Sequence, residues 1–158
     1  MKLIFTPNPD EPYNLIQITP NWDLLSDYDN DEAKVLNRVI ERNKTVGQIA
    51  VDAPYWIVDS DEVPTDHYFF EAWEYRDNSV RVNMVKARNI HLTNIRQARN
   101  AKLALLDIPF IRAIESGDND EIKRITTEKQ VLRDIPQTLN LDAYDDTDTL
   151  KSVWPEVL

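Results

Sequence analysis

The chain has no cysteine, two glycines and two histidines among its 158 residues. Without cysteine it has neither a disulfide nor a thiolate metal site. Two glycines are too few for a Gly-rich loop that holds phosphate groups, which excludes GxGxxG and Walker-type nucleotide sites. Because the only histidines are His67 and His91, a histidine-based metal cage is not expected. We predict no metal-binding residue and no cofactor.

Long hydrophobic runs are also missing from the sequence. No apolar stretch approaches the ~20 residues that a membrane-spanning helix needs. The first residues, MKLIFTPNPDEPYN, reach proline and aspartate too soon for a signal peptide. We therefore expect a soluble intracellular protein with no membrane partner.

The net charge of −10 is distributed unevenly. Residues 1–76 carry −9, residues 77–115 carry +4, and residues 116–158 carry −5. Neutralisation within the chain explains a basic segment between acidic flanks, and a site for an acidic partner is the alternative. Nucleic acid is not expected as a partner, because the acidic remainder would repel phosphate groups.

No arrangement of residue types in the sequence predicts catalysis. A Ser-His-Asp set needs a serine in a sharp turn beside a histidine, and neither His67 nor His91 lies in such a pattern. The acidic stretch 59–66 lacks the glycine and the final glutamate of an EF-hand, so a solvated loop is the simpler interpretation. We predict that the chain has no catalytic residue and is not an enzyme.

The first half of the chain predicts a small mixed unit. KLIF and NLIQI, on either side of the turn sequence NPDEP, are typical of an antiparallel hairpin over residues 2–18. Residues 31–42 follow a helical period, and residues 55–58 favour a strand. Residues 69–75 alternate as a strand does, which we favour over a short helix. Ten aromatic residues between positions 13 and 75 predict a compact core. An aromatic surface for a carbohydrate or peptide is the alternative.

Helical periodicity dominates the second half. One helix is predicted over residues 82–116, with a break near Leu106 caused by Pro109, and Gly117 ends it. A second helix runs from 118 to 133, ended by Pro136, and a short one spans 147–153. The residues expected to face inward are Met84, Val85, Leu92, Ile95, Ala98, Leu103, Leu105 and Leu106 on the first helix, and Ile122, Ile125, Val131 and Leu132 on the second.

Together these patterns predict an α+β fold. Residues 1–77 form a small α+β domain with a short antiparallel sheet, and residues 78–158 form a helical hairpin domain with a short C-terminal helix. The connection 137–146 is expected to lie over the hairpin. An amphipathic hairpin buries its apolar face internally or against a second copy of the chain. The sequence therefore does not decide between a monomer and a homo-oligomer.

Five residues are candidates for binding a partner: Arg88, His91, Arg96, Arg99 and Trp154. Arg88, Arg99 and Lys102 lie near the apolar face of the first helix, and Arg96 lies at its edge, where an unpaired charge is costly. We expect them to pair with the acidic first domain or with residues 118–121, or else to dock another protein. His91 is interpreted as a helix residue satisfied by a hydrogen bond. Trp154 folds back on the hairpin or anchors a partner.

Several segments resemble a known protein family both in their residues and in their order along the chain. IHLTNIRQAR (90–99), KLALLDIPFIRAIESGD (102–118), KQVLRDIPQT (129–138) and LKSVWPEVL (150–158) resemble the tail-assembly-chaperone-like domain of tailed bacteriophages. Residues 53–75 resemble the segment that often precedes it. The resemblance covers residues 53–158 and implies a phage tail or tail-fibre protein as partner, in the host cytoplasm during assembly.

Three functions stay open at this point. The first is a non-enzymatic phage protein that binds a tail or tail-fibre protein during virion assembly. The second is a structural component that stays in the virion, which needs a larger and more apolar interface. The third is a carbohydrate-binding module built on N-terminal aromatics such as Trp56 and Trp73.

Overall fold

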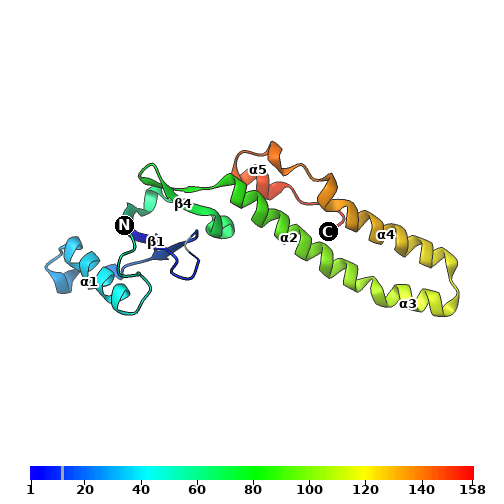
Figure 1. Cartoon of the computed structure of the whole chain (residues 1–158), viewed down its shortest axis with the longest axis horizontal. Coiled ribbons are helices and arrows are strands. Elements are labelled where there is room, and N and C mark those ends of the chain that lie inside the picture. The colour runs from blue at the N-terminus through cyan, green and yellow to red at the C-terminus, as the bar shows by residue number, and fades with distance from the viewer. Residues whose placement is uncertain (12) are drawn as a thin grey trace. The chain divides into compact units, whose positions relative to one another are not determined.

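The computed structural model describes residues 1–11 and 13–158, which form two compact units, Met1–Asn83 and Met84–Leu158. The fold is α+β, as the sequence predicts: the described strands lie in the first unit, and the second is a helical hairpin (Figure 1). The predicted boundary after residue 77 falls within a β-turn of the first unit. Among the described residues, every helix is too short or too polar to cross a membrane.

A three-stranded antiparallel sheet organises the first unit. Its spatial order is β2-β1-β3, with bounds β1 Lys2–Pro7, β2 Leu15–Ile18 and β3 Trp56–Asp59. Ile4 at the centre of β1 lies opposite Ile18 on β2 and opposite Ile57 on β3. The predicted hairpin and third strand are confirmed, while Pro12 in the predicted turn lies outside the described residues.

Alternation along β1 divides the core between the two faces of this sheet. Leu3 and Phe5 pack on one face with Trp73 and other residues from the second half of the unit. On the opposite face, Ile4 packs with apolar residues of helix α1, Glu32–Thr45. Phe5, Phe69 and Trp73 are fully buried, so the aromatic residues do supply a compact core.

The predicted strand over 69–75 is wrong in its first part. Residues His67–Ala72 form 3₁₀ turns (η3), which begin where the Asp66 carboxylate accepts a hydrogen bond of 2.9 Å from the Tyr68 N–H. Phe69 and Ala72, three residues apart, are both buried, a spacing that suits a helical turn rather than a strand. Two further 3₁₀ segments, η1 Trp22–Tyr28 and η2 Ser60–Glu62, follow β2 and β3.

A second β-hairpin, which the sequence reading missed, completes the unit. It joins β4 Trp73–Arg76 to β5 Ser79–Val82. Asp77 and Asn78 between the strands have φ of 53° and 59°. Two consecutive positive φ values match the twist of a two-residue hairpin, and Asp and Asn tolerate them best after Gly.

The second unit is a hairpin of three helices with a C-terminal segment packed against it. Its elements are α2 Met84–Leu105, α3 Asp107–Ser116, α4 Asn119–Thr138, η4 Leu141–Ala143 and α5 Thr147–Ser152. The predicted break at Leu106 is confirmed. Gly117 ends α3 in the left-handed region, and Asp118 then caps α4 by accepting from the Glu121 N–H.

The end of α4 differs from its prediction. The helix continues through Pro136 to Thr138, although proline at that position removes one hydrogen-bond donor. Ile135 is buried beside Ile95 and Leu132, and its carbonyl accepts from the Leu139 N–H at 3.2 Å. Packing of Ile135 therefore outweighs the local preference against a helical residue before proline.

The inward face of the hairpin is narrower than the helical period predicts. Ile95, Ile125 and Leu132 are buried as expected, but Val85, Leu105 and Val131 are exposed. The predicted apolar arc spans half of the α2 circumference, and α4 and α5, which pack against α2, leave Val85 and Leu105 uncovered. Leu139 and Leu158 pack against the hairpin core, which confirms that the C-terminal segment lies over it.

Candidate functional site

Arg88 holds the C-terminal segment against α2. Its Nε and Nη2 donate to the Tyr144 carbonyl at 3.2 and 2.8 Å, and Nη2 also donates to the Asp145 carboxylate at 2.9 Å. The Arg88 side chain is only 17% exposed, so the guanidinium is largely desolvated and its donors are used within the unit. A planar group with several donors suits this double role.

His91 and Trp154 meet on the same side of α2. The fully buried His91 ring lies with Nε2 2.8 Å from the Val153 carbonyl. A carbonyl only accepts, so Nε2 must carry the proton. The Trp154 ring lies edge-on to His91, with 5.9 Å between centroids, and remains 44% exposed. His91 is thus a hydrogen-bonded helix residue, as interpreted from the sequence, and Trp154 folds back without being buried.

The remaining predicted site residues, Arg96 and Arg99, do not join this group. Lys102 donates to the Val157 carbonyl, and Arg99 donates to the neighbouring Asn100 amide oxygen at 2.9 and 3.2 Å. Arg96 is exposed, and within the described residues the structure records no ion pair for it. Arg88, His91 and Trp154 come together at the C-terminal segment, whereas Arg96 and Arg99 lie farther along α2.

The pairing expected for Arg88 is corrected by the structure. Its carboxylate partners are Asp145 and, at 4.0 Å, Asp142, rather than residues 118–121. Glu121 is instead bound by Arg124, whose hydrogen bond lowers the pKa of the Glu121 carboxyl. The cause is topological: residues 118–121 lie at the turn between α3 and α4, and Arg88 lies near the other end of α2.

An exposed apolar surface lies at the end of the hairpin, on α3 and the last residue of α2. We call it the hairpin-end stripe, and its members are Leu105, Ile108, Ile111 and Ile114, exposed by 76, 61, 53 and 53%. Members three residues apart are neighbours on the helix surface, and each is turned by roughly 60° from the last, so Ile108, Ile111 and Ile114 wind over about a third of the α3 circumference. Four large aliphatic side chains this exposed form the kind of patch that marks an interaction site.

The other face of α3 explains why this stripe stays uncovered. Ala113 is buried against the hairpin, and the Lys129 ammonium of α4 lies 4.8 Å above the Phe110 ring. The same ammonium donates to the Asp107 carboxylate at 2.6 Å. These contacts fix α3 with Phe110 and Ala113 turned toward α4. Ile111 and Ile108 lie roughly 100° and 160° from Phe110 around the helix, so these two members of the stripe face away from α4.

Sequence reasoning missed the hairpin-end stripe, although a signal for it exists. The notable pattern is that α3 is apolar on both faces, because Ile108 and Ile111 alternate with Phe110 and Ala113 over one and a half turns. A helix that is apolar all round is buried on every side or serves as an interface. The predicted candidates were instead chosen by charge and aromatic character, which led to residues that bind the chain's own C-terminal segment.

Several acidic side chains of the described residues cap helices, and the acidic side chains there are not gathered into a metal site. No three His, Asp or Glu side chains among residues 1–11 and 13–158 are arranged to hold a metal ion. The Asp146 carboxyl has a lowered pKa because it accepts hydrogen bonds from the Thr149 hydroxyl and N–H at the start of α5. The lowered pKa of Asp146 is thus explained by its role as the cap of α5. Asp118 caps α4 in the same way.

Comparison with known protein families, with curated proteins and with solved structures finds no match.

Proposed function

We propose that the protein binds a tail or tail-fibre protein of a bacteriophage while the virion is assembled in the host cytoplasm. The hairpin-end stripe is its client-binding surface. The resemblance of residues 53–158 to tail-assembly-chaperone-like proteins supports the class of client. The observation that carries the proposal is the exposure of Leu105, Ile108, Ile111 and Ile114 at the hairpin end, with Ile108 and Ile111 on the side of α3 away from the packed Phe110.

The energetics favour a protein client for this surface. Covering one Leu or Ile side chain contributes roughly 1.5–3 kcal/mol, so four adjacent ones supply the apolar centre of an interface. An assembly factor needs such a centre, because its client exposes apolar, aggregation-prone surface until it is built into the particle. A stripe of this size suits reversible binding better than a permanent interface, which buries a larger and more apolar area.

Co-expression with the tail-fibre protein of the same phage tests the proposal. The wild-type chain should raise the soluble fraction of the fibre protein and co-elute with it in size-exclusion chromatography. Ile108→Asp with Ile111→Asp should abolish both effects, because two buried carboxylates would lack partners. Gln97→Asp is the matched control, since it adds charge at an exposed position of α2 outside the stripe. Co-elution that survives the double substitution contradicts the proposal.

Two further outcomes are informative. Sedimentation of the protein alone shows whether a second copy covers the stripe. A dimer that dissociates on the double Ile→Asp substitution would assign the stripe to self-association and remove the client proposal. Stoichiometric amounts of the protein in purified particles, measured by mass spectrometry, would assign it to the virion as a permanent component.

A further inference from the structure

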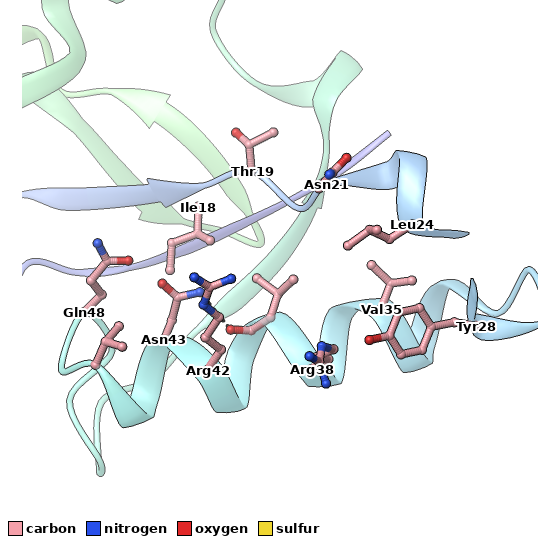
Figure 2. A pocket seen from close by; sticks show the side chains of 12 residues that line it. Ile18, Thr19, Asn21, Leu24, Tyr28, Val35, Arg38, Arg42, Asn43 and Gln48 are labelled. Carbon is pink, nitrogen blue, oxygen red and sulfur yellow. Dashed lines mark hydrogen bonds between the residues drawn. The ribbon is translucent and has the colours of Figure 1, made fainter. Parts of the chain in front are cut away.

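A pocket in the first unit combines an apolar floor with two arginines. It has a volume of about 420 Å³ and lies between α1, the end of β2 and η1. Figure 2 shows Arg38 and Arg42 on α1, between Tyr28 at one end of the pocket and Gln48 at the other, below Ile18 and Thr19. The size falls within the range of pockets that bind small molecules or short peptide segments.

The arginines of this pocket differ from every other basic side chain of their unit. Residues 1–83 hold sixteen acidic and seven basic side chains. Lys2, Lys34 and Lys44 each lie within 3.2 Å of a carboxylate oxygen. Arg76 and Arg81 both lie within 4.0 Å of Asp77. Arg38 and Arg42 alone have no carboxylate within that distance among the described residues.

This lack of partners is specific, because acidic side chains surround the helix. Asp31 caps α1 by accepting from two backbone N–H groups, and Glu32, Glu41 and Asp29 bind lysines. Arg38 has one recorded contact, with its guanidinium 6.0 Å from the Tyr28 ring centroid. In a strongly acidic unit, both cations without an acid partner therefore line the same pocket.

The two arginines have the geometry for a carboxylate. Positions four apart on a helix lie on one face, so both guanidinium groups serve one anionic group or two neighbouring ones. Arginine binds carboxylates through paired N–H donors, which gives direction as well as attraction. Beside them, Val35, Val39 and Leu24 offer apolar surface that a purely ionic ligand would leave uncovered.

We propose that this pocket binds an extended peptide segment of a partner protein, with an acidic side chain on Arg38 and Arg42 and an adjacent aliphatic side chain on the apolar floor. A peptide fits better than a free anion because β2 is an edge strand of the sheet and its last residue, Ile18, lines the pocket. An edge strand offers backbone groups to a chain that runs beside it. The site is independent of the hairpin-end stripe.

Titration of the ¹⁵N-labelled full chain, followed by NMR, tests this proposal with three capped peptides. The probe is acetyl-Gly-Asp-Leu-Ile-Glu-Gly-amide. Its neutral counterpart replaces Asp and Glu by Asn and Gln, and its polar counterpart replaces Leu and Ile by Ser. We expect the probe to shift amide signals of α1 and β2 and to bind at least about tenfold more tightly than either counterpart, which is about 1.4 kcal/mol. Its affinity should fall as sodium chloride is added.

Two double variants separate the pocket from general charge. Arg38→Gln with Arg42→Gln should weaken probe binding at least about tenfold, whereas Arg76→Gln with Arg81→Gln removes the same charge from exposed positions and should leave binding unchanged. Circular dichroism checks that both variants fold. The proposal is overturned if millimolar probe shifts no pocket amide, if the three peptides bind alike, or if both double variants weaken binding equally. Inorganic phosphate that binds as tightly as the probe would also overturn it, and would assign the pocket to small anions.

Discussion

His91 and Trp154 lie in contact, yet the two residues should contribute differently to stability. His91 is fully buried and bonded to the Val153 carbonyl, whereas Trp154 keeps 44% of its surface in water. His91→Ala leaves a cavity and an unpaired carbonyl, and should lower the free energy of unfolding by about 2–4 kcal/mol. Trp154→Ala removes a half-exposed ring and should cost about 1–2 kcal/mol. Urea denaturation of both variants checks the order, and a larger loss for Trp154→Ala would contradict it.

The cap of α5 predicts a dependence on pH. The Thr149 hydroxyl and N–H lower the folded-state pKa of Asp146 below its ordinary value of 3.8. The stabilisation from this cap is therefore complete above the unfolded-state pKa and is lost as pH falls through the lowered folded value. Carboxyl-detected NMR titration should find the Asp146 pKa lowered, and Thr149→Val should raise it toward the ordinary value. An unchanged pKa in this variant would show that the hydroxyl does not hold the carboxylate.

Single residues also show where charge was misread from sequence. The arginines of α2 were recognised as cations near an apolar face, and that placement holds for Arg88. Its partner could not be chosen from the sequence, because acidic residues occur in every flanking segment and only the path of residues 139–158 brings Tyr144 and Asp145 to it. The helical period of the sequence places a charged residue on one face of a helix, whereas tertiary topology decides which partner that residue meets.

At the scale of elements, the turn between α3 and α4 depends on one glycine. Gly117 has φ of 70°, and a Cβ there would meet no atom within 4 Å. Gly117→Ala should therefore cost only the backbone strain of the left-handed region, about 1 kcal/mol in thermal unfolding. Gly117→Asn should cost less, because asparagine tolerates this region. Equal losses for the two variants would show that side-chain volume, not backbone conformation, limits the site.

Pro109 predicts a local effect on the junction of α2 and α3. The break lies at Leu106, and Pro109 falls in the first turn of α3, where a missing N–H is least costly. Pro109→Ala supplies a donor that can bond to the Leu105 carbonyl and continue the ladder. Amide exchange at residues 107–110 should slow, with the free energy of unfolding changed by less than about 1 kcal/mol. Exchange that stays as fast as in the wild type would place the cause of the break elsewhere.

Element by element, the sequence predicted type and order better than extent. Strong local signals, such as the turn before β2 and Gly117 after α3, identified the first hairpin and the helix end. The β4–β5 hairpin was missed because its turn, Asp77-Asn78, contains no glycine and its strands are only four residues each. Pro136 was overvalued as a helix terminator because the burial of Ile135 is a tertiary effect that local preference does not contain.

At the scale of the molecule, each unit carries its own candidate surface. The first unit offers a pocket with two arginines, and the second offers the hairpin-end stripe. The α+β class was predictable because the hydrophobic period changes from two to 3.6 along the chain. The pocket with two arginines was not predictable, because it is defined by what remains unpaired after folding. The hairpin-end stripe had a signal in the sequence, an α3 that is apolar on both faces, but that pattern does not say which face stays uncovered. Exposure and pairing are properties of the finished packing.

The central claim, that the hairpin-end stripe binds a protein client, is tested most directly by hydrogen–deuterium exchange of the full chain with and without the tail-fibre protein of the same phage. Binding should slow exchange in residues 105–114, the segment that holds Leu105, Ile108, Ile111 and Ile114. A complex that protects only other segments, and leaves residues 105–114 as fast as in the free chain, would contradict the account.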